Sequence, residues 1–279
     1  MAIIDAFSFY NELELLEIRL HELYDVVDEF VLVEATRTHT GKDKPLYYNL
    51  NKHKFANFSD KIVHVVVEDM PITDEEIQEA ITEKDRTWLE SKWQFESNWV
   101  RERFQRNAIM RVLQDAHPED IIIIEDADEM VRSDVIASLD TILVDGCNAV
   151  SQALHAYYIN WECTNMKWHG SKILRRKFVD NPSEHRCHTD IAKYIHNGGW
   201  HFSYLGGADV IKEKILSFAH QEFNMPEVFD NISNNLSNMK DGIGRLYQYK
   251  IVPIDNSYPK YLAFNLDKFE HWIYKEGYE

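Results

Sequence analysis

Residues 121–130 read IIIIEDADEM, so four β-branched apolar residues run directly into four closely spaced carboxylates. A short apolar run of this kind is typical of a strand that is buried on both faces of a parallel sheet. Carboxylates this close together repel one another unless a positive group lies among them. The segment therefore predicts a central strand that ends at a site where something positive balances Glu125, Asp126, Asp128 and Glu129.

The first half of the chain alternates strand-like and helix-like segments. Apolar patterning predicts strands over 3–9, 26–34, 62–67 and 121–124. Helices are predicted over 12–24 with Asn11 as the cap, after the cap Thr73, over 87–115, and after the cap Ser133. This alternation favours an α/β fold with a mostly parallel central sheet flanked by helices.

The second half of the chain is more mixed in its patterning. Strands are predicted over 148–161, 172–177 and 199–205, and helices over 208–219 and 264–276. No segment has the composition of a linker between two independent domains. We therefore expect one domain over residues 1–279.

Net charge and composition exclude several classes of protein. The formal net charge of −17 disfavours phosphate backbones and anionic lipid surfaces as partners, so we expect no nucleic-acid binding. No stretch approaches the roughly 20 apolar residues of a membrane span, and the first residues lack the basic region of a secretion signal. The three cysteines show no metal-ligand spacing and predict free thiols. We expect a cytoplasmic protein without a membrane span.

Asp126 and Asp128 are the strongest candidates for a functional site. In open α/β sheets, ligands collect beyond the carboxyl ends of the strands, where these two residues lie. Carboxylate oxygens are hard ligands that suit Mg²⁺ or Mn²⁺, and such an ion would relieve their repulsion. The alternative is a solvated acidic turn before a helix. The flanking Glu125 and Glu129 either support the ligands of the ion from behind or are simply exposed, and we favour exposure for each.

Several longer segments are similar to a known family. They are IDAFSFYNELELLEIRLHELYDVVDEFVLVEATRTHTGKDKPL, EDADE, NGGWHFSYLGG and KILSFAHQEF. The chain resembles glycosyltransferase family 17, the β-1,4-mannosyl-glycoprotein 4-β-N-acetylglucosaminyltransferase family. The resemblance implies a GT-A-like fold and an inverting transfer from UDP-N-acetylglucosamine to a glycan hydroxyl. It also implies a divalent cation, Mn²⁺ or Mg²⁺, held by the D-x-D pair, here Asp126 and Asp128. In our interpretation, Asp126 contacts either the donor's ribose or the waters of the metal ion.

Three further residues are candidates for binding the donor. Glu34 and Thr38 lie where a predicted strand opens into a polar loop that matches the family pattern, and either one can bind the uridine side. Their alternative role is hydrogen bonding within the loop. Arg106 lies on an apolar helix seam, where a buried guanidinium needs a partner. That partner is either the donor diphosphate or a carboxylate of the same protein.

Two segments in the family-matching motifs carry candidate metal and catalytic residues. A neutral imidazole can complete the shell of a cation begun by two aspartates, and we favour His220 over His201 for this role. An inverting transfer needs a base for the acceptor hydroxyl. Glu222 is our first candidate and Asp209 the second, with helix capping or salt bridging as the alternative for both.

Aromatic residues of the second half are candidates for binding the acceptor. Trp168 and His169 form a W-H-G turn, and Trp200 begins the segment GWHF. Aromatic rings bind sugars through their apolar faces, although core packing is the simpler role for each tryptophan. With the resemblance, we expect a nucleotide-sugar-binding half over 1–145 and an acceptor-side half over 146–279.

Two other functions stay open on the residues alone. The same acid pair suits a nucleotidyltransferase or phosphohydrolase that acts on a nucleotide. The aromatic content, with 7 Trp, 14 Tyr and 14 Phe, also suits a non-catalytic carbohydrate-binding protein. Binding of UDP distinguishes the enzymes from a non-catalytic carbohydrate-binding protein. The products released distinguish a glycosyltransferase from a nucleotidyltransferase or phosphohydrolase.

Overall fold

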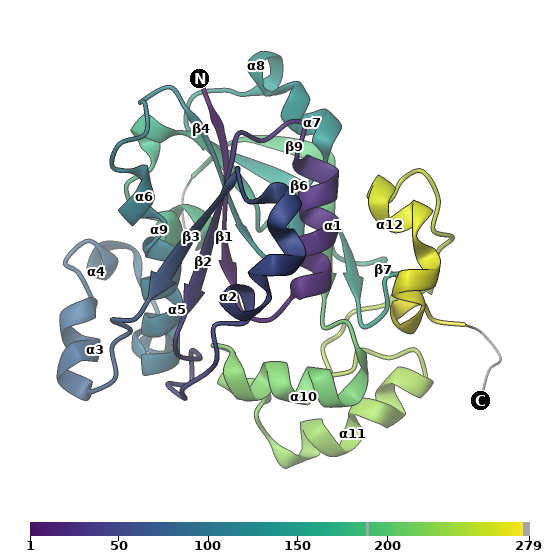
Figure 1. The fold of residues 1–279 in the computed structure, drawn as a ribbon. Helices are drawn as coiled ribbons and strands as arrows, with labels where there is room; N and C mark the ends of the chain where they lie inside the picture. The colour runs from purple at the N-terminus through teal and green to yellow at the C-terminus, as the bar shows by residue number, and fades with distance from the viewer. Residues whose placement is uncertain (188–189, 276–279) are drawn as a thin grey trace.

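The computed structural model describes residues 1–187 and 190–275. Helices cover both faces of a central sheet, and the chain starts at one end of that sheet (Figure 1). The strands within the described residues are β1 (Ile3–Phe9), β2 (Glu29–Ala35), β3 (Ile62–Val67), β4 (Ile121–Asp126), β5 (Glu129–Val131), β6 (Cys147–Ala156), β7 (Trp161–Cys163), β8 (Lys172–Arg175), β9 (Ile191–Ser203) and β10 (Tyr249–Ile251).

The sheet joins both halves of the chain. Its strand order is β10-β7-β6-β8-β4-β1-β2-β3, and β9 pairs with β6 and β5. Strands β3, β2, β1 and β4 are parallel, whereas β8 joins β4 and β6 through antiparallel pairs. Because β1 and β4 run side by side in the same direction, their carboxyl ends lie together. The predicted α/β class with a central sheet flanked by helices is confirmed.

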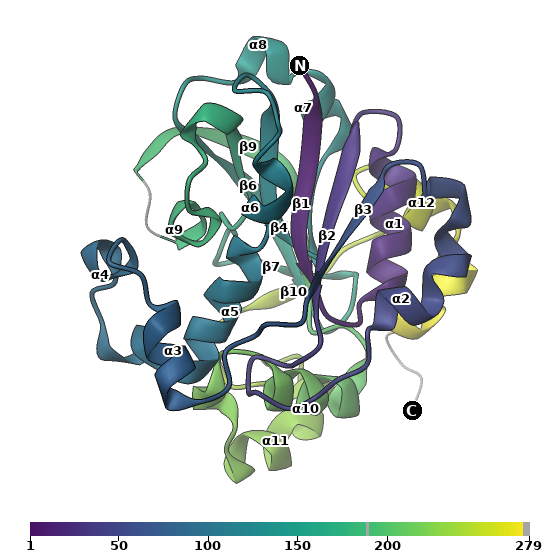
Figure 2. The ribbon, with the colours of Figure 1, turned by 60° about the vertical axis from the view of Figure 1, so that its left-hand side comes forward.

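The four isoleucines of β4 face both sides of the sheet, as their sequence predicts. Ile121 and Ile123 pack into one apolar cluster with α1 (Leu13–Leu23), while Ile122 and Ile124 pack into a second cluster with α6 (Met110–Leu113) and its flanking residues. All four are 0% exposed. Figure 2 shows α1 on one side of the strands and α5 (Ser97–Asn107) and α6 on the other.

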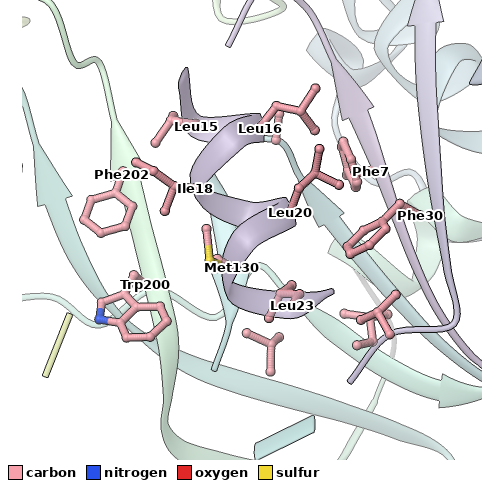
Figure 3. Close-up of a cluster of buried hydrophobic side chains, with 14 of the residues drawn as sticks. Phe7, Leu15, Leu16, Ile18, Leu20, Leu23, Phe30, Met130, Trp200 and Phe202 are labelled. Carbon is pink, nitrogen blue, oxygen red and sulfur yellow. The ribbon is translucent and has the colours of Figure 1, made fainter. Parts of the chain in front are cut away.

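Helix α1 fills the space between the two parts of the sheet. Leucines on one side of the helix point toward β1 and β2, and Ile18 and Leu15 point toward β9 (Figure 3). The side chains labelled in this cluster are Phe7, Leu15, Leu16, Ile18, Leu20, Leu23, Phe30, Met130, Trp200 and Phe202. The packing of α1 fixes β1 and β4 relative to β9, and so positions the residues at the strand ends.

The helices differ from the sequence expectation at several ends. The remaining helices are α2 (Tyr47–Asn51), α3 (Asp74–Ala80), α4 (Asp85–Trp88), α7 (Ser133–Ala137), α8 (Leu139–Ile142), α9 (Pro182–Cys187), α10 (Gly207–Ser217), α11 (Pro226–Ser237) and α12 (Lys260–Phe264). Thr73 caps α3 through a capping box, as predicted. Helix α1 begins after Glu12 rather than after Asn11, and the residue before α7 is Arg132, not Ser133.

The long helix predicted over 87–115 is wrong. The segment contains α4, a 3₁₀ turn η2 (Lys92–Phe95), α5 and α6. The Gln94 side chain accepts hydrogen bonds from the backbone N–H groups of Glu90 and Ser91, at 2.9 and 2.8 Å, which competes with a continuous helix. Glu96 is extended, with φ −67° and ψ 149°, and α5 starts after it.

The second half also departs from the expected boundaries. The segment predicted as a strand over 199–205 is the end of the longer β9. The tail predicted as a helix consists of α12 and a 3₁₀ segment η5 (Leu266–Trp272); the other 3₁₀ segments are η1 (Lys52–Phe58), η3 (Arg176–Phe178) and η4 (Gln221–Phe223). All three cysteines are free, as predicted. Of the helices in residues 1–187 and 190–275, none has the length and apolar character to cross a bilayer.

Candidate functional site

A cavity of about 410 Å³ opens at the carboxyl ends of β1 and β4. Ser8 at the end of β1 and the Asp126-Ala127-Asp128 turn after β4 line one side. Lys214 of α10 and Arg245 line it from the second half of the chain. Figure 1 shows α10 below these strand ends. The acid pair therefore lies in the wall of a cavity to which both halves contribute.

Asp126 lies between two buried guanidinium groups. Its Oδ1 atom is 2.9 Å from Arg106 Nη2, and its Oδ2 atom is 2.7 Å from Arg186 Nη2. The arginine side chains are 5% and 7% exposed. Burial opposes ionisation of Asp126, but Arg186 and Arg106 outweigh that effect and hold the pKa of its carboxyl well below the usual range. Asp126 is therefore an ionised, fixed carboxylate.

Asp128 has a different pair of partners. Its Oδ2 atom is 2.7 Å from Lys214 Nζ, and its Oδ1 atom is 3.5 Å from His201 Nε2. The Asp128 carbonyl accepts a hydrogen bond from the Phe202 N–H at 2.7 Å, next to the pairing of β5 with β9. Burial opposes its ionisation, yet Lys214 and His201 hold the pKa of Asp128 well below its usual range.

The flanking glutamates are buried, which corrects the expectation that they are exposed. Glu125 and Glu129 are both 0% exposed. Glu125 accepts hydrogen bonds from Arg19 Nη1 at 2.8 Å and from the Ser171 hydroxyl at 2.5 Å. Burial raises the pKa of the Glu125 carboxyl, and the charge of Arg19 opposes the rise. Glu129 pairs with Arg186 and accepts a hydrogen bond from the Trp168 indole N–H.

Protein cations thus balance each acid of the segment IIIIEDADE. Arg19 bridges Glu125 and Asp5, Arg186 bridges Asp126 and Glu129, and Lys214 holds Asp128. In the part of the chain that the structure describes, no group of three or more His, Cys, Asp or Glu side chains is arranged to hold a metal ion. The repulsion expected among the four carboxylates is therefore relieved by positively charged side chains of the protein itself.

Comparison with known proteins decides the family. The family model described as glycosyltransferase family 17 matches residues 1–234 of this chain. The chain belongs to glycosyltransferase family 17. The resemblance that its segments carry is therefore confirmed.

Individual relatives of this family 17 chain are distant. The human β-1,4-mannosyl-glycoprotein 4-β-N-acetylglucosaminyltransferase is 25% identical over 319 aligned residues, which cover 99% of this chain and 56% of the human protein. This chain spans about half the length of the curated relatives it matches.

Similar solved structures include HddC from Yersinia pseudotuberculosis. It is 10% identical with a TM-score of 0.36, over 74% of this chain and 90% of HddC. The galactosyltransferase LgtC, in complex with donor and acceptor sugar analogs, is 9% identical with a TM-score of 0.34, over 98% of this chain and 95% of LgtC.

The residues predicted for donor binding have different surroundings. Glu34 is 0% exposed, accepts a hydrogen bond from the Tyr48 N–H at 3.0 Å, and contacts His64 at 3.0 Å; it is not part of the cavity lining. Its contacts match the alternative of internal hydrogen bonding. Thr38 does line the cavity, and its hydroxyl contacts Thr40 at 2.9 Å. Arg106 also lines the cavity. Its partners are the carboxylates of Asp126 and Glu102, so in this structure it pairs with acids of the same protein, which was the alternative to the donor diphosphate.

The structure places His201, not His220, against Asp128. His220 lines the cavity, its Nδ1 atom is 2.6 Å from Glu222 Oε1, and its ring packs edge-on against Trp99. Glu222 lines the cavity as well, and its side chain is 56% exposed. Asp209 is exposed in the first turn of α10 and lies outside the lining. The roles of these residues stay predictions.

Of the three predicted acceptor residues, Trp168 lines the cavity, whereas His169 and Trp200 do not. Trp168 lines the cavity, with its ring centroid 4.6 Å from that of His201. His169 is exposed outside the lining, and its Nε2 atom is 2.7 Å from the Ser151 hydroxyl. Trp200 is 4% exposed in the core, and its indole N–H donates to the Ser257 carbonyl at 2.9 Å (Figure 3).

Sequence reasoning missed four residues that shape the site. Arg19, Arg186 and Lys214 supply the charges that balance the acids. Glu12 lines the cavity, accepts hydrogen bonds from the Tyr10 and Asn11 N–H groups at 2.9 and 3.0 Å, and has a pKa that burial raises. Arg19 and Lys214 lie at helical spacing from leucines and isoleucines, a pattern that indicates the buried face of a helix. Arg186 lies in no such periodic pattern.

Proposed function

We propose that this chain is an inverting glycosyltransferase that moves N-acetylglucosamine from UDP-N-acetylglucosamine to a hydroxyl group of a glycan. One observation carries the proposal: Asp126 and Asp128 lie together in the wall of a cavity of about 410 Å³ beyond the ends of parallel strands. The family match supports sugar transfer. The name of the human relative supports N-acetylglucosamine as the sugar and a glycan as the acceptor.

The charge distribution of the cavity supports a donor that carries a diphosphate. The protein has a net charge of −17, whereas in the cavity wall the carboxylates of Glu12, Glu102, Asp126, Asp128 and Glu222 are matched by cationic side chains. They are Arg37, Lys44, Arg106, Lys214 and Arg245. Cations in a partly enclosed site stabilise the negative charge that grows on a leaving diphosphate. The same wall includes Trp168, whose ring suits the apolar face of an acceptor sugar.

The transfer step assigns one role to Glu222. Its carboxylate takes the proton of the acceptor hydroxyl, whose oxygen attacks the anomeric carbon from the face opposite the diphosphate. The bond between that carbon and the diphosphate oxygen breaks, and UDP leaves with the bonding electrons. Glu222 is preferred to Asp209 because it lies in the cavity wall, and its partner His220 orients it there.

The fold family implies a divalent cation, and Asp128 is the residue that fits it. Both oxygens of Asp126 are held by buried guanidinium groups, so Asp126 is better suited to contact the donor's ribose. Asp128 offers hard oxygens toward the cavity once Lys214 moves away. Mn²⁺ or Mg²⁺ bound there would neutralise charge on the leaving diphosphate. No described contact joins His220 to either aspartate, so its metal role stays a prediction.

A screen of nucleotide sugars tests the proposed function. The purified chain is incubated with UDP-, GDP- and CMP-linked sugars and Mn²⁺, and the products are resolved by chromatography. We expect slow hydrolysis of UDP-N-acetylglucosamine to UDP and free sugar, and faster release of UDP with a suitable glycan. Release of pyrophosphate, phosphate or a sugar phosphate would instead indicate nucleotidyl transfer or phosphohydrolysis. Glycan binding without any binding of UDP would indicate a non-catalytic carbohydrate-binding protein.

A further inference from the structure

Lys214 reaches the acid pair from the last turn of α10. The helix starts at Gly207, directly after Gly206, and these two glycines have φ angles of +83° and +113°, a backbone region that glycine adopts without strain. Ile211 and Ile215 on the same helix are 0% exposed and anchor it in the core. The Lys214 ammonium group lies 5.1 Å from the centroid of the Tyr204 ring. The helix therefore holds the base of the side chain while its end reaches into the cavity.

The contact between Lys214 and Asp128 differs from the other ion pairs of the site. The Nζ atom lies 2.7 Å from Asp128 Oδ2, and the Lys214 side chain is 26% exposed. The guanidiniums on Asp126 are only 5% and 7% exposed. A lysine side chain has four rotatable bonds and a compact charge, whereas a buried forked guanidinium is fixed by its planar contacts. Of these cations, Lys214 is the one that can leave its carboxylate without breaking the core.

A metal ion and the Lys214 ammonium compete for the same oxygen. Like charges at hydrogen-bond distance repel, so a divalent ion on Asp128 Oδ2 requires the ammonium to move. A second carboxylate, Glu12, lies in the same cavity wall and acts electrostatically on Lys214. A donor diphosphate in the cavity would add further negative charge within reach. The ammonium thus has acceptors to move to without leaving the cavity.

We propose that Lys214 is a placeholder cation, which holds Asp128 in the donor-free protein and yields that carboxylate to a divalent ion, turning to the phosphates of the donor. The inference rests on the proposed function for the nature of the donor. The competition at Asp128 itself depends only on the geometry of the pair. The chain therefore keeps a charged carboxylate in place until metal and donor arrive together.

The first test measures Mn²⁺ binding to the nucleotide-free chain by calorimetry. Lys214→Met should raise the affinity for Mn²⁺ at least about tenfold, since a like charge next to the ligand is removed. Lys214→Arg keeps a positive charge and should bind Mn²⁺ as weakly as the wild type. Lys212→Met is the matched control, because Lys212 lies on the same helix as Lys214 but outside the cavity lining. Its affinity for Mn²⁺ should change less than about twofold.

The second test measures UDP binding at a saturating concentration of Mn²⁺. Lys214→Met should weaken UDP binding at least about fivefold, since a cation that faces the diphosphate is lost. Metal and nucleotide affinities thus change in opposite directions, whereas a purely structural role for Lys214 would lower both. Melting curves establish that each variant folds, and Lys214→Arg provides a readout if Lys214→Met does not.

Three results would overturn the placeholder role. They are an unchanged Mn²⁺ affinity in Lys214→Met, a gain equal to that of Lys212→Met, and a gain of Mn²⁺ affinity in Lys214→Arg. The tests use no sugar transfer, so they separate this inference from the proposed function. A gain in Mn²⁺ affinity together with no turnover of any nucleotide sugar would retain the competition and reject the transferase.

Discussion

The Nη2 atom of Arg186, in the short helix α9, lies 2.7 Å from the Oδ2 atom of Asp126 at the end of β4. The same nitrogen pairs with Glu129, whose side chain is 0% exposed. One guanidinium from the second half of the chain therefore fixes two acids of the first half. Its loss would leave a buried glutamate without its charged partner.

Replacing Arg186 with Met should lower the free energy of unfolding by about 3–5 kcal/mol, because a buried charge loses its partner. Lys84→Met is the control, since Lys84 pairs with Asp180 at the surface, where the side chains are 41% and 67% exposed. The control should cost no more than about 1 kcal/mol. Urea unfolding of both variants measures the difference. Equal losses would show that the Arg186 contacts are not an organising part of the site.

Stability should fall in acid because of His155. Burial lowers the pKa of His155 to about 4, so the imidazole is neutral in the folded chain, whereas in the unfolded chain it titrates near pH 6.5. The unfolded state therefore binds the extra proton as the pH falls from about 6.5 to about 4. This contribution to stability is complete above about pH 6.5 and is lost through that window, on the order of 2–3 kcal/mol at pH 4.5.

His155→Gln should remove that part of the pH dependence. The comparison is the urea midpoint of variant and wild type at pH 7.5 and pH 4.5. Other groups titrate in both proteins, so the difference between their slopes isolates His155. Parallel losses in the two proteins would show that His155 is protonated in the folded chain.

The two candidate bases differ in position and should differ in effect. Glu222→Gln should lower kcat for glycosyl transfer by about 10²–10⁴-fold with little change in stability, because the exposed carboxylate lies in the cavity wall and is the base that we propose for the acceptor hydroxyl. Asp209→Asn, outside the lining, should leave kcat within about twofold. A loss confined to Asp209→Asn would reverse the assignment of the base.

Trp168 and Trp200 should have different roles, acceptor binding for Trp168 and core packing for Trp200. Trp168→Ala should raise KM for the glycan acceptor, since its ring lines the cavity. Trp200→Ala should instead lower the free energy of unfolding by about 3–5 kcal/mol, because Trp200 is 4% exposed in the core. Steady-state kinetics and urea unfolding of both variants distinguish these effects. A change of acceptor KM in a stably folded Trp200→Ala would contradict this division.

The strand and the acid pair could be predicted because their signals are local. The run IIII identifies β4, and the two aspartates follow it in the chain. Alternation along β4 also places Glu125 on the face of Ile121 and Ile123, which packs against α1. Strand alternation thus predicts a buried Glu125, and our expectation that Glu125 is exposed did not take this alternation into account.

The cations of the site could be predicted only in part. Arg19 lies three residues after Leu16 and four before Leu23, the kind of apolar seam that marked Arg106. Lys214 lies three residues after Ile211 in the same way. Arg186 and His201 reach the acid pair through the packing of α9 and the pairing of β5 with β9. Contacts this distant in the chain leave no periodic pattern.

The most direct test of the central claim is UDP release from UDP-N-acetylglucosamine and a glycan acceptor by the wild type and Asp128→Asn, with Mn²⁺ present. Asp134→Asn is the control, since Asp134 is an exposed acid outside the cavity lining. We expect turnover by the wild type and the control, and a loss of at least about 10²-fold in Asp128→Asn. Equal turnover by Asp128→Asn and the wild type would contradict the role of the acid pair in sugar transfer.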